Sequence, residues 1–140
     1  MAIKMRVLHY TNKGKLMSAA DHIRAEYDLA VNAVDTIPPA YSCNNERIVI
    51  LVLSVKADAD DTLRRFVLEL TKARAQNVAI ITDGKEAGAE KVKGYLKKAG
   101  TNVIEDVHYM KVGLFSGKNL TDDEKSALSA WTKKVVESLV

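Results

Sequence analysis

The 140-residue sequence has few residues of several types, and each scarcity narrows the class of protein. It contains one cysteine, Cys43, and two prolines, and only 6% of its residues are aromatic. A lone cysteine cannot form an internal disulfide, which favours a reducing compartment, so we expect a cytoplasmic protein. No apolar run approaches the roughly 20 residues that a membrane-spanning helix needs. The start of the chain also lacks the zones of a secretory signal, so we expect no membrane partner.

The excess of positive over negative charge is also small. The sequence has 21 basic and 18 acidic residues, which give a net charge of +3. The lysines are spread over several segments rather than gathered in one run. A nucleic-acid footprint needs a concentrated basic patch, so we expect no nucleic-acid partner. The length and the 47% hydrophobic content suffice for a core without disulfides or metal, and we expect residues 1–140 to form a single domain.

Motifs for metal binding and for covalent catalysis are missing as well. The three histidines, His9, His22 and His108, have no spacing typical of metal ligands. No nucleophile-elbow pattern and no Walker-type phosphate loop occurs. A cysteine phosphatase needs an arginine six residues after its cysteine, and that position after Cys43 is Val49. The sequence therefore indicates neither a metal site nor a catalytic set.

The first 27 residues carry the strongest positive pattern. Residues 5–8 form a short apolar run typical of a buried strand. A polar, glycine-containing loop follows at residues 10–15, and apolar residues then return at helical spacing at Leu16, Ala20, Ile23 and Tyr27. This order predicts a strand, a loop wide enough for an anion, and a helix.

The rest of the chain repeats the alternation of strand and helix. Residues 29–34 are a second strand candidate, and Pro38 and Pro39 then keep residues 38–46 out of any helix, so the second helix is expected to be short or missing. The remaining predicted elements are a central strand at 47–54, a helix from Asp60 or Asp61 to Ala73, a strand at 77–82, a helix ended by Gly100, a strand or broken strand within 101–112, and a last helix with a capping box of Thr121 and Glu124.

This alternation predicts an α/β fold with a doubly wound, five-stranded parallel sheet and helices on both faces. In such sheets the ligand lies at the carboxyl ends of the strands, near the point where the strand order reverses. That rule selects three loops, at residues 10–15, 54–61 and 82–88. The second loop is acidic, and its Asp58, Asp60 and Asp61 serve either as a helix start or as contacts to an uncharged part of a ligand.

The first loop has the properties of a phosphate site. A loop that opens a helix presents unpaired backbone N–H groups and the positive end of the helix dipole. Thr11 and Asn12 can donate hydrogen bonds, Lys13 and Lys15 add positive charge, and Gly14 lets the backbone approach a ligand closely. The common alternative is a strand-to-helix turn that binds nothing.

At this loop the sequence resembles the flavodoxin-like proteins, which hold the phosphate of FMN in a Ser/Thr-x-Thr/Ser-Gly-x-Thr loop after the first strand. Here Thr11 and Gly14 match, Lys13 stands in place of one hydroxyl, and Leu16 in place of another. The tail, residues 113–117 followed by Leu120, Thr121 and the helix with Trp131, is also similar to that of small flavodoxin-like proteins.

The resemblance implies the strand order 2-1-3-4-5, an FMN cofactor, a role in electron transfer or a reductase-linked task, and a redox partner protein. The cofactor-binding residues that it implies are Thr11, Asn12, Lys13, Gly14, Lys15 and Leu16 in the first loop, Ser54, Val55 and Lys56 in the second, and Thr82, Asp83 and Gly84 in the third.

The chain departs from the family where the flavin ring is usually covered by aromatic side chains. Residues 54–61 and 82–88 contain no aromatic residue, and only Tyr10 and Tyr41 are placed to substitute. Aromatic faces on the ring tune its reduction, so their lack favours a second hypothesis. In that hypothesis the flavodoxin-like module has lost flavin and works in interaction or regulation.

Overall fold

A computed structural model of the chain describes residues 3–113 and 117–139. Its sheet is parallel throughout, with the strand order β2-β1-β3-β4-β5 and with β6 paired to β4 beyond the end of β5. The elements in chain order are β1 (Met5–Tyr10), α1 (Gly14–Glu26), the 3₁₀ turn η1 (Val31–Ala33), β2 (Val34–Thr36), β3 (Ile48–Leu53), α2 (Asp61–Leu68), β4 (Asn77–Thr82), α3 (Glu86–Ala99), β5 (Asn102–Val103), β6 (His108–Tyr109) and α4 (Asp122–Glu137).

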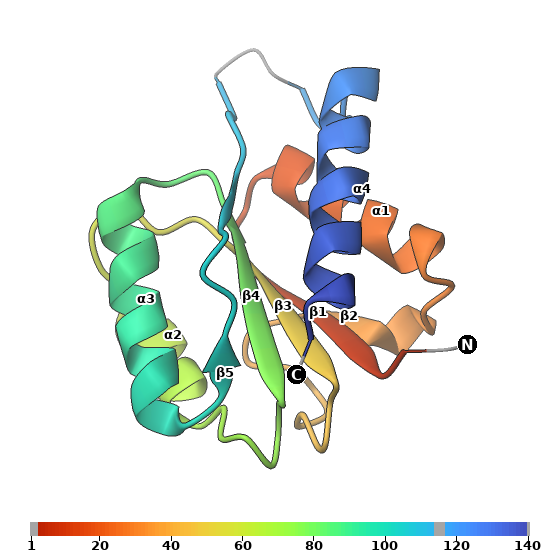
Figure 1. Cartoon of the computed structure of the whole chain (residues 1–140). Coiled ribbons are helices and arrows are strands. Elements are labelled where there is room, and N and C mark those ends of the chain that lie inside the picture. Colours follow the sequence, from red (N-terminus) through yellow and green to blue (C-terminus); the bar gives the residue numbers. More distant parts are fainter. Residues whose placement is uncertain (1–2, 114–116, 140) are drawn as a thin grey trace.

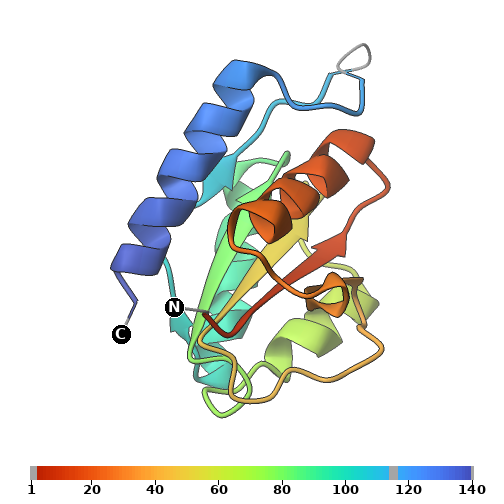
Figure 2. The same cartoon turned by 90° about the vertical axis from the view of Figure 1, so that its right-hand side faces the viewer.

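Helices cover both faces of this sheet. α1 and α4 lie on one face, and α2 and α3 lie on the other (Figure 1). The view turned by 90° shows α4 crossing the sheet beside α1 (Figure 2). Every residue of β3 and β4 is buried, as expected for central strands of a parallel sheet. The predicted fold class, strand order and two-sided helical cover are confirmed.

Successive residues of β1 point to opposite faces of the sheet and pack in two separate hydrophobic cores. Val7 packs with Leu16, Ile23 and Trp131 under α1 and α4, whereas Leu8 packs with the residues under α2 and α3. Side chains of a strand alternate between the two faces, so a continuous apolar run buries both of them. The start of α1 is thereby held at the carboxyl end of β1.

The prediction of a strand at residues 29–34 is wrong. That segment begins with an irregular stretch and the η1 turn, and β2 covers only Val34–Thr36. Asp28, with a positive φ of 51°, turns the chain sharply after α1, and Val31 is 80% exposed. The apolar residues of this segment therefore do not mark a buried strand, because the turn points them in other directions.

Two other expectations concern helices. The helix predicted to run to Ala73 ends at Leu68, because residues 69–75 fold into turns that bring Arg74 N–H to Thr71 O and Asn45 N–H to Ala73 O. No helix lies between β2 and β3 in the described residues, as predicted. The loop there is held by Asp35, whose carboxylate accepts from the N–H groups of Thr36 and Ala40.

The helix ends follow the predicted signals. Asp60 caps α2 by accepting from the N–H of Leu63, the capping box of Thr121 and Glu124 opens α4, and Gly100 ends α3 with a φ of 105°. A residue in this left-handed region is usually glycine. The last predicted strand is broken into β5 and β6, both beside β4.

Residues 114–116, which belong to the tail segment of the family resemblance, lie outside the described residues. No helix in the described part of the chain is both long enough and apolar enough to cross a membrane.

Candidate functional site

The loops after β1, β3 and β4 meet at the carboxyl edge of the sheet. The hydroxyl oxygens of Thr11 and Ser54 are 2.7 Å apart, which joins the first loop to the second. The ammonium of Lys13 lies 2.8 Å from the carboxylate of Asp83, which joins the first loop to the third. The structure thus brings together residues from all three loops that the sequence selects.

The start of α1 is open to an anion. Lys13 is the residue before the helix, no side chain of the described residues caps the first turn, and that turn contains no acidic residue. The N–H of Lys13 donates to the Thr11 hydroxyl at 3.1 Å. The first amides of a helix have no partner within the helix, and the dipole adds positive potential there. Thr11 therefore orders the loop that leads into this first turn.

Two pockets flank this turn. One, of about 380 Å³, is lined by Tyr10, Thr11, Asn12, Thr36 and Ser54. The other, of about 390 Å³, is lined by Lys13, Gly14, Val112 and Gly113. The β1–α1 loop separates them, so a ligand can approach it from either side.

Lys118 packs against Gly14, one of the residues that line the second pocket. A Cβ added to Gly14 would lie 2.8 Å from Cγ of Lys118, and the backbone oxygen of Lys118 accepts a hydrogen bond from the Ser18 hydroxyl. The close approach that Gly14 allows is therefore to this lysine. Lys118 was not predictable as a neighbour of Gly14, because nothing in the local sequence pattern indicates a contact with a residue about 100 positions away.

Two residues of the predicted set contribute only their backbone to this edge. The side chain of Lys15 is buried, and its ammonium contacts both carboxylate oxygens of Glu124, at 2.8 and 3.1 Å. Leu16 is fully buried in the core under α1 and α4. Their amides belong to the first turn of α1, but their side chains point elsewhere.

The second and third loops are in direct contact with each other. Val55 is buried, and a Cβ added to Gly84 would lie 1.8 Å from the backbone oxygen of Val55. The hydroxyl of Thr82 accepts from the N–H of Gly84 at 2.9 Å. Lys56 is exposed. The bases of the two loops therefore leave no space for a ring between Val55 and Gly84.

Two tyrosines donate hydrogen bonds to the acidic loop at residues 54–61. The Tyr10 hydroxyl donates to Asp60 at 2.6 Å, and the Tyr95 hydroxyl donates to Asp58 at 2.8 Å. The hydrogen bond to Asp60 raises the pKa of Tyr10. The amide of Leu63, and then Tyr10, lower the pKa of Asp60. Asp60 is therefore both a helix cap and an anchor for Tyr10.

Two further residues at this edge escaped the sequence analysis. Thr36 ends β2 and lines the Thr11 pocket, and it would have been selected if the strand had been placed correctly. Tyr95 lies on α3 and contributes only its hydroxyl. Tyr41, one of the two possible substitutes for a ring-covering aromatic, lines a pocket at the opposite edge of the sheet, so only Tyr10 lies at this one.

The residues present fit the phosphate end of FMN and do not form an aromatic sandwich for its ring. The hydroxyls of Thr11 and Ser54 lie just before the uncapped start of α1, and Lys13, whose ammonium pairs with Asp83, is the residue between them and the helix. Hydroxyls, a cation and the start of a helix are the groups of a phosphate site. The described residues contain no group of acidic, histidine and cysteine side chains that could hold a metal ion.

A parallel sheet in the order 2-1-3-4-5, helices on both faces and a polar turn after the first strand define a flavodoxin-like fold. Solved structures of flavodoxins share it. The flavodoxin of Streptococcus pneumoniae TIGR4 has a TM-score of 0.69 at 10% identity, covering 96% of this chain and 99% of that one. A short-chain flavodoxin associated with a non-canonical PDU bacterial microcompartment has 0.70 at 11%, covering 99% of each chain.

Oxidised flavodoxin 1 of Bacillus cereus is similar with a TM-score of 0.61 at 15% identity, covering 97% of this chain and 98% of that one. No protein-family model and no curated protein matches the sequence. At these identities the likeness shows the fold, and the fold expected from the sequence is confirmed.

Proposed function

We propose that this protein binds FMN through the β1–α1 turn and acts in electron transfer or in a reductase-linked task. The observation that carries this proposal is the pair of hydroxyls of Thr11 and Ser54, 2.7 Å apart, beside the uncapped start of α1. The similar solved structures are named as flavodoxins, which supports the same cofactor class. A fold alone hosts many functions, so the proposal depends on the turn.

The phosphate would be held by groups from the first two loops. Thr11 and Ser54 supply hydroxyls, Asn12 supplies a side-chain amide, and Lys13 supplies a positive charge. Gly14, Lys15 and Leu16 supply backbone N–H groups at the positive end of the helix dipole. The remainder of the ligand would meet the backbone of the other two loops, at Val55, Lys56, Thr82, Asp83 and Gly84.

When bound, FMN supplies the electron-transfer chemistry, and the protein supplies binding, orientation and exclusion of water. Lys13 also forms an ion pair within the protein, because its ammonium contacts the carboxylate of Asp83. A phosphate placed at the turn would compete with Asp83 for this charge. We therefore expect FMN affinity to fall with salt, as for other partly exposed charge pairs. A redox partner protein is part of this proposal.

A second function is favoured by the contact between Val55 and Gly84. That contact leaves no gap for a ring, and no aromatic residue lies in residues 54–61 or 82–88. Under this alternative the turn binds no flavin, and the protein works as an interaction or regulatory module with the flavodoxin-like fold.

The two functions are separated by a fluorescence titration of the purified protein with FMN and with riboflavin, which lacks the phosphate. We expect FMN to bind and riboflavin to bind at least about tenfold more weakly, because charge-assisted hydrogen bonds to the phosphate are lost. A preparation that is yellow when purified would agree with this. A colourless preparation that binds neither flavin would support the alternative.

A matched pair of variants locates the site. Thr11→Val removes the hydroxyl that faces Ser54 and keeps the shape of the side chain. It should weaken FMN binding by roughly threefold to tenfold, the usual effect of one hydrogen bond. Thr71→Val makes the same change on an exposed residue after α2 and should leave the affinity unchanged. Equal affinity of both variants would place FMN elsewhere.

A further inference from the structure

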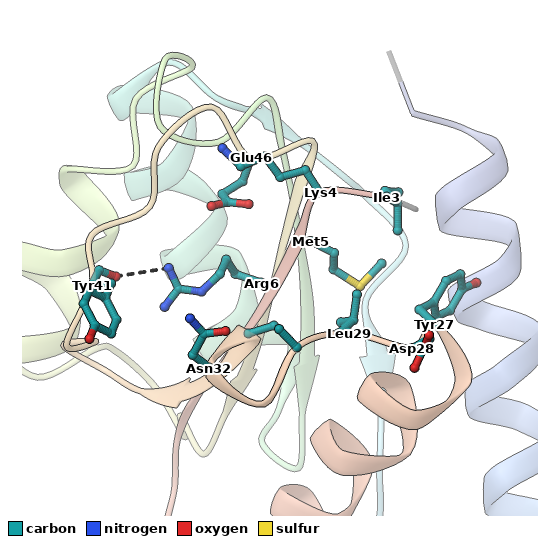
Figure 3. A pocket seen from close by; sticks show the side chains of 12 residues that line it. Ile3, Lys4, Met5, Arg6, Tyr27, Asp28, Leu29, Asn32, Tyr41 and Glu46 are labelled. Carbon is teal, nitrogen blue, oxygen red and sulfur yellow. Dashed lines mark hydrogen bonds between the residues drawn. The ribbon is translucent and has the colours of Figure 1, made fainter. Parts of the chain in front are cut away.

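A second pocket lies at the amino ends of the strands, on the edge opposite the Thr11 turn. It has a volume of about 400 Å³ and is lined by the start of β1, the end of α1 with the turn that follows it, and the loop between β2 and β3. Figure 3 shows the residues around it. β2 pairs with β1 only from Val7 to His9, so the edge of the chain at residues 3–6 is left open on that side.

Arg6 is the unusual residue in this pocket. Its side chain is buried, with 8% of the residue exposed, and Nη1 donates to the backbone oxygen of Tyr41 at 3.1 Å. Nε and Nη2 are buried and have no hydrogen-bond partner among the described residues. A guanidinium stays charged in proteins, and a buried donor without a partner is costly. This arrangement points to a missing acceptor.

The nearby acids do not supply that acceptor. Both carboxylate oxygens of Asp35 already accept from backbone amides, those of Thr36 and Ala40. Glu46 is buried and lines the pocket, but among the described residues it accepts no hydrogen bond from Nε or Nη2 of Arg6. In Figure 3 the guanidinium lies between Tyr41 and Asn32, with Glu46 on the side away from Asn32.

The two free nitrogens define the shape of the ligand. Nε and Nη2 form the lateral edge of the guanidinium, where two N–H groups point in the same direction and match the two oxygens of a carboxylate. Asn32 is exposed and lies beside this edge (Figure 3). Both nitrogens are buried, so a small anion needs the Asn32 side chain to rotate toward solvent before it can reach them.

The charge of the pocket selects the class of anion. Lys4 and Arg6 are balanced by Asp28 and Glu46, so a doubly charged phosphate or sulfate would meet repulsion from the carboxylates. Ile3, Met5 and Leu29 also line the pocket, but their side chains pack toward Tyr27, on the other side of β1 from the guanidinium (Figure 3). We propose that this pocket binds a small monocarboxylate, held by a bidentate pair with Arg6.

The experiment uses benzoate as the probe and benzamide as its neutral analogue. Benzoate is titrated into the ¹⁵N-labelled protein while the Nε–H resonance of Arg6 is followed by NMR, and its affinity is measured by calorimetry. We expect a saturable shift of that resonance with benzoate and none with benzamide. Absence of saturable binding, or equal binding of benzamide, would overturn the proposal.

A pair of variants tests the residue. Arg6→Met removes the charge and keeps a long apolar side chain, so the protein is expected to fold because a buried unpaired charge is lost. It should bind benzoate roughly tenfold or more weakly than the unaltered protein. Arg65→Met, at an exposed position on α2, should bind benzoate normally. Unchanged affinity in Arg6→Met would show that the anion site lies elsewhere.

Discussion

Gly84 is the residue at which the second and third loops of the site meet. A Cβ there would lie 1.8 Å from the Val55 oxygen and 3.2 Å from the Thr82 hydroxyl. Neither neighbour is the free end of a long side chain, so the contact cannot be relieved by a simple rotation. The loop after β4 needs a glycine at this position for a reason of packing, independent of any ligand.

Replacing Gly84 by alanine should therefore destabilise the protein by roughly 1–3 kcal/mol, the usual cost of forcing extra atoms into a packed site. Gly94→Ala is the matched control. Gly94 lies within α3 with nothing within 4 Å of an added Cβ, and alanine there should stabilise by about 0.5–1 kcal/mol. Urea denaturation of both variants measures this difference, and a neutral Gly84→Ala would contradict the close contact.

At the scale of whole elements, helices α1 and α4 are joined by an ion pair between Lys15 and Glu124. Lys15 near the start of α1 is buried, and Glu124 in the first turn of α4 is partly exposed. The hydrogen bond from Lys15, followed by that from the Thr121 amide, lowers the pKa of Glu124. This pair joins the helix whose start forms the proposed site to the neighbouring helix on the same face of the sheet.

Glu124→Gln should keep the amide capping interaction and lose the charge. We expect a loss of about 1–2 kcal/mol near neutral pH, since a buried ammonium loses its partner while Glu124 is only partly buried. A carboxylate with a lowered pKa stabilises the fold above its ordinary value of 4.5, and that stabilisation disappears as the pH falls through the lowered pKa.

Urea denaturation at neutral pH and at a pH well below 4.5 tests this expectation. The difference between Glu124→Gln and the unaltered protein should shrink in acid. In a Lys15→Met background the pH dependence of that difference should be much smaller, because the charge that lowers the pKa is gone. A difference that stays constant with pH would refute the role of the pair.

At the scale of the whole molecule, the strands and most helices were predictable because their apolar residues repeat with clear periods, whereas the strand order followed from the family resemblance. Asp60, Gly100 and Thr121 also act locally, so their roles at helix ends were readable from the sequence. The second strand was misplaced because the turn at Asp28 redirects an apolar segment.

The site was less predictable, since its side chains are arranged by distant contacts. Lys15 and Glu124 are 109 positions apart, and Lys118 reaches Gly14 from another segment. The pocket around Arg6 depends on three separate segments of the chain. The sequence signals this pocket only by a charged residue, Arg6, within the first apolar strand. An arginine at that position does not indicate which groups surround it.

The central claim is that the backbone amides at the start of α1 bind the phosphate of FMN. Its most direct test is a ¹⁵N–¹H NMR titration of the protein with FMN. We predict that the amide resonances of Lys13, Gly14, Lys15 and Ser54 shift together and saturate at one FMN per chain. Shifts confined to other residues, or no shifts at all at millimolar FMN, would contradict the claim.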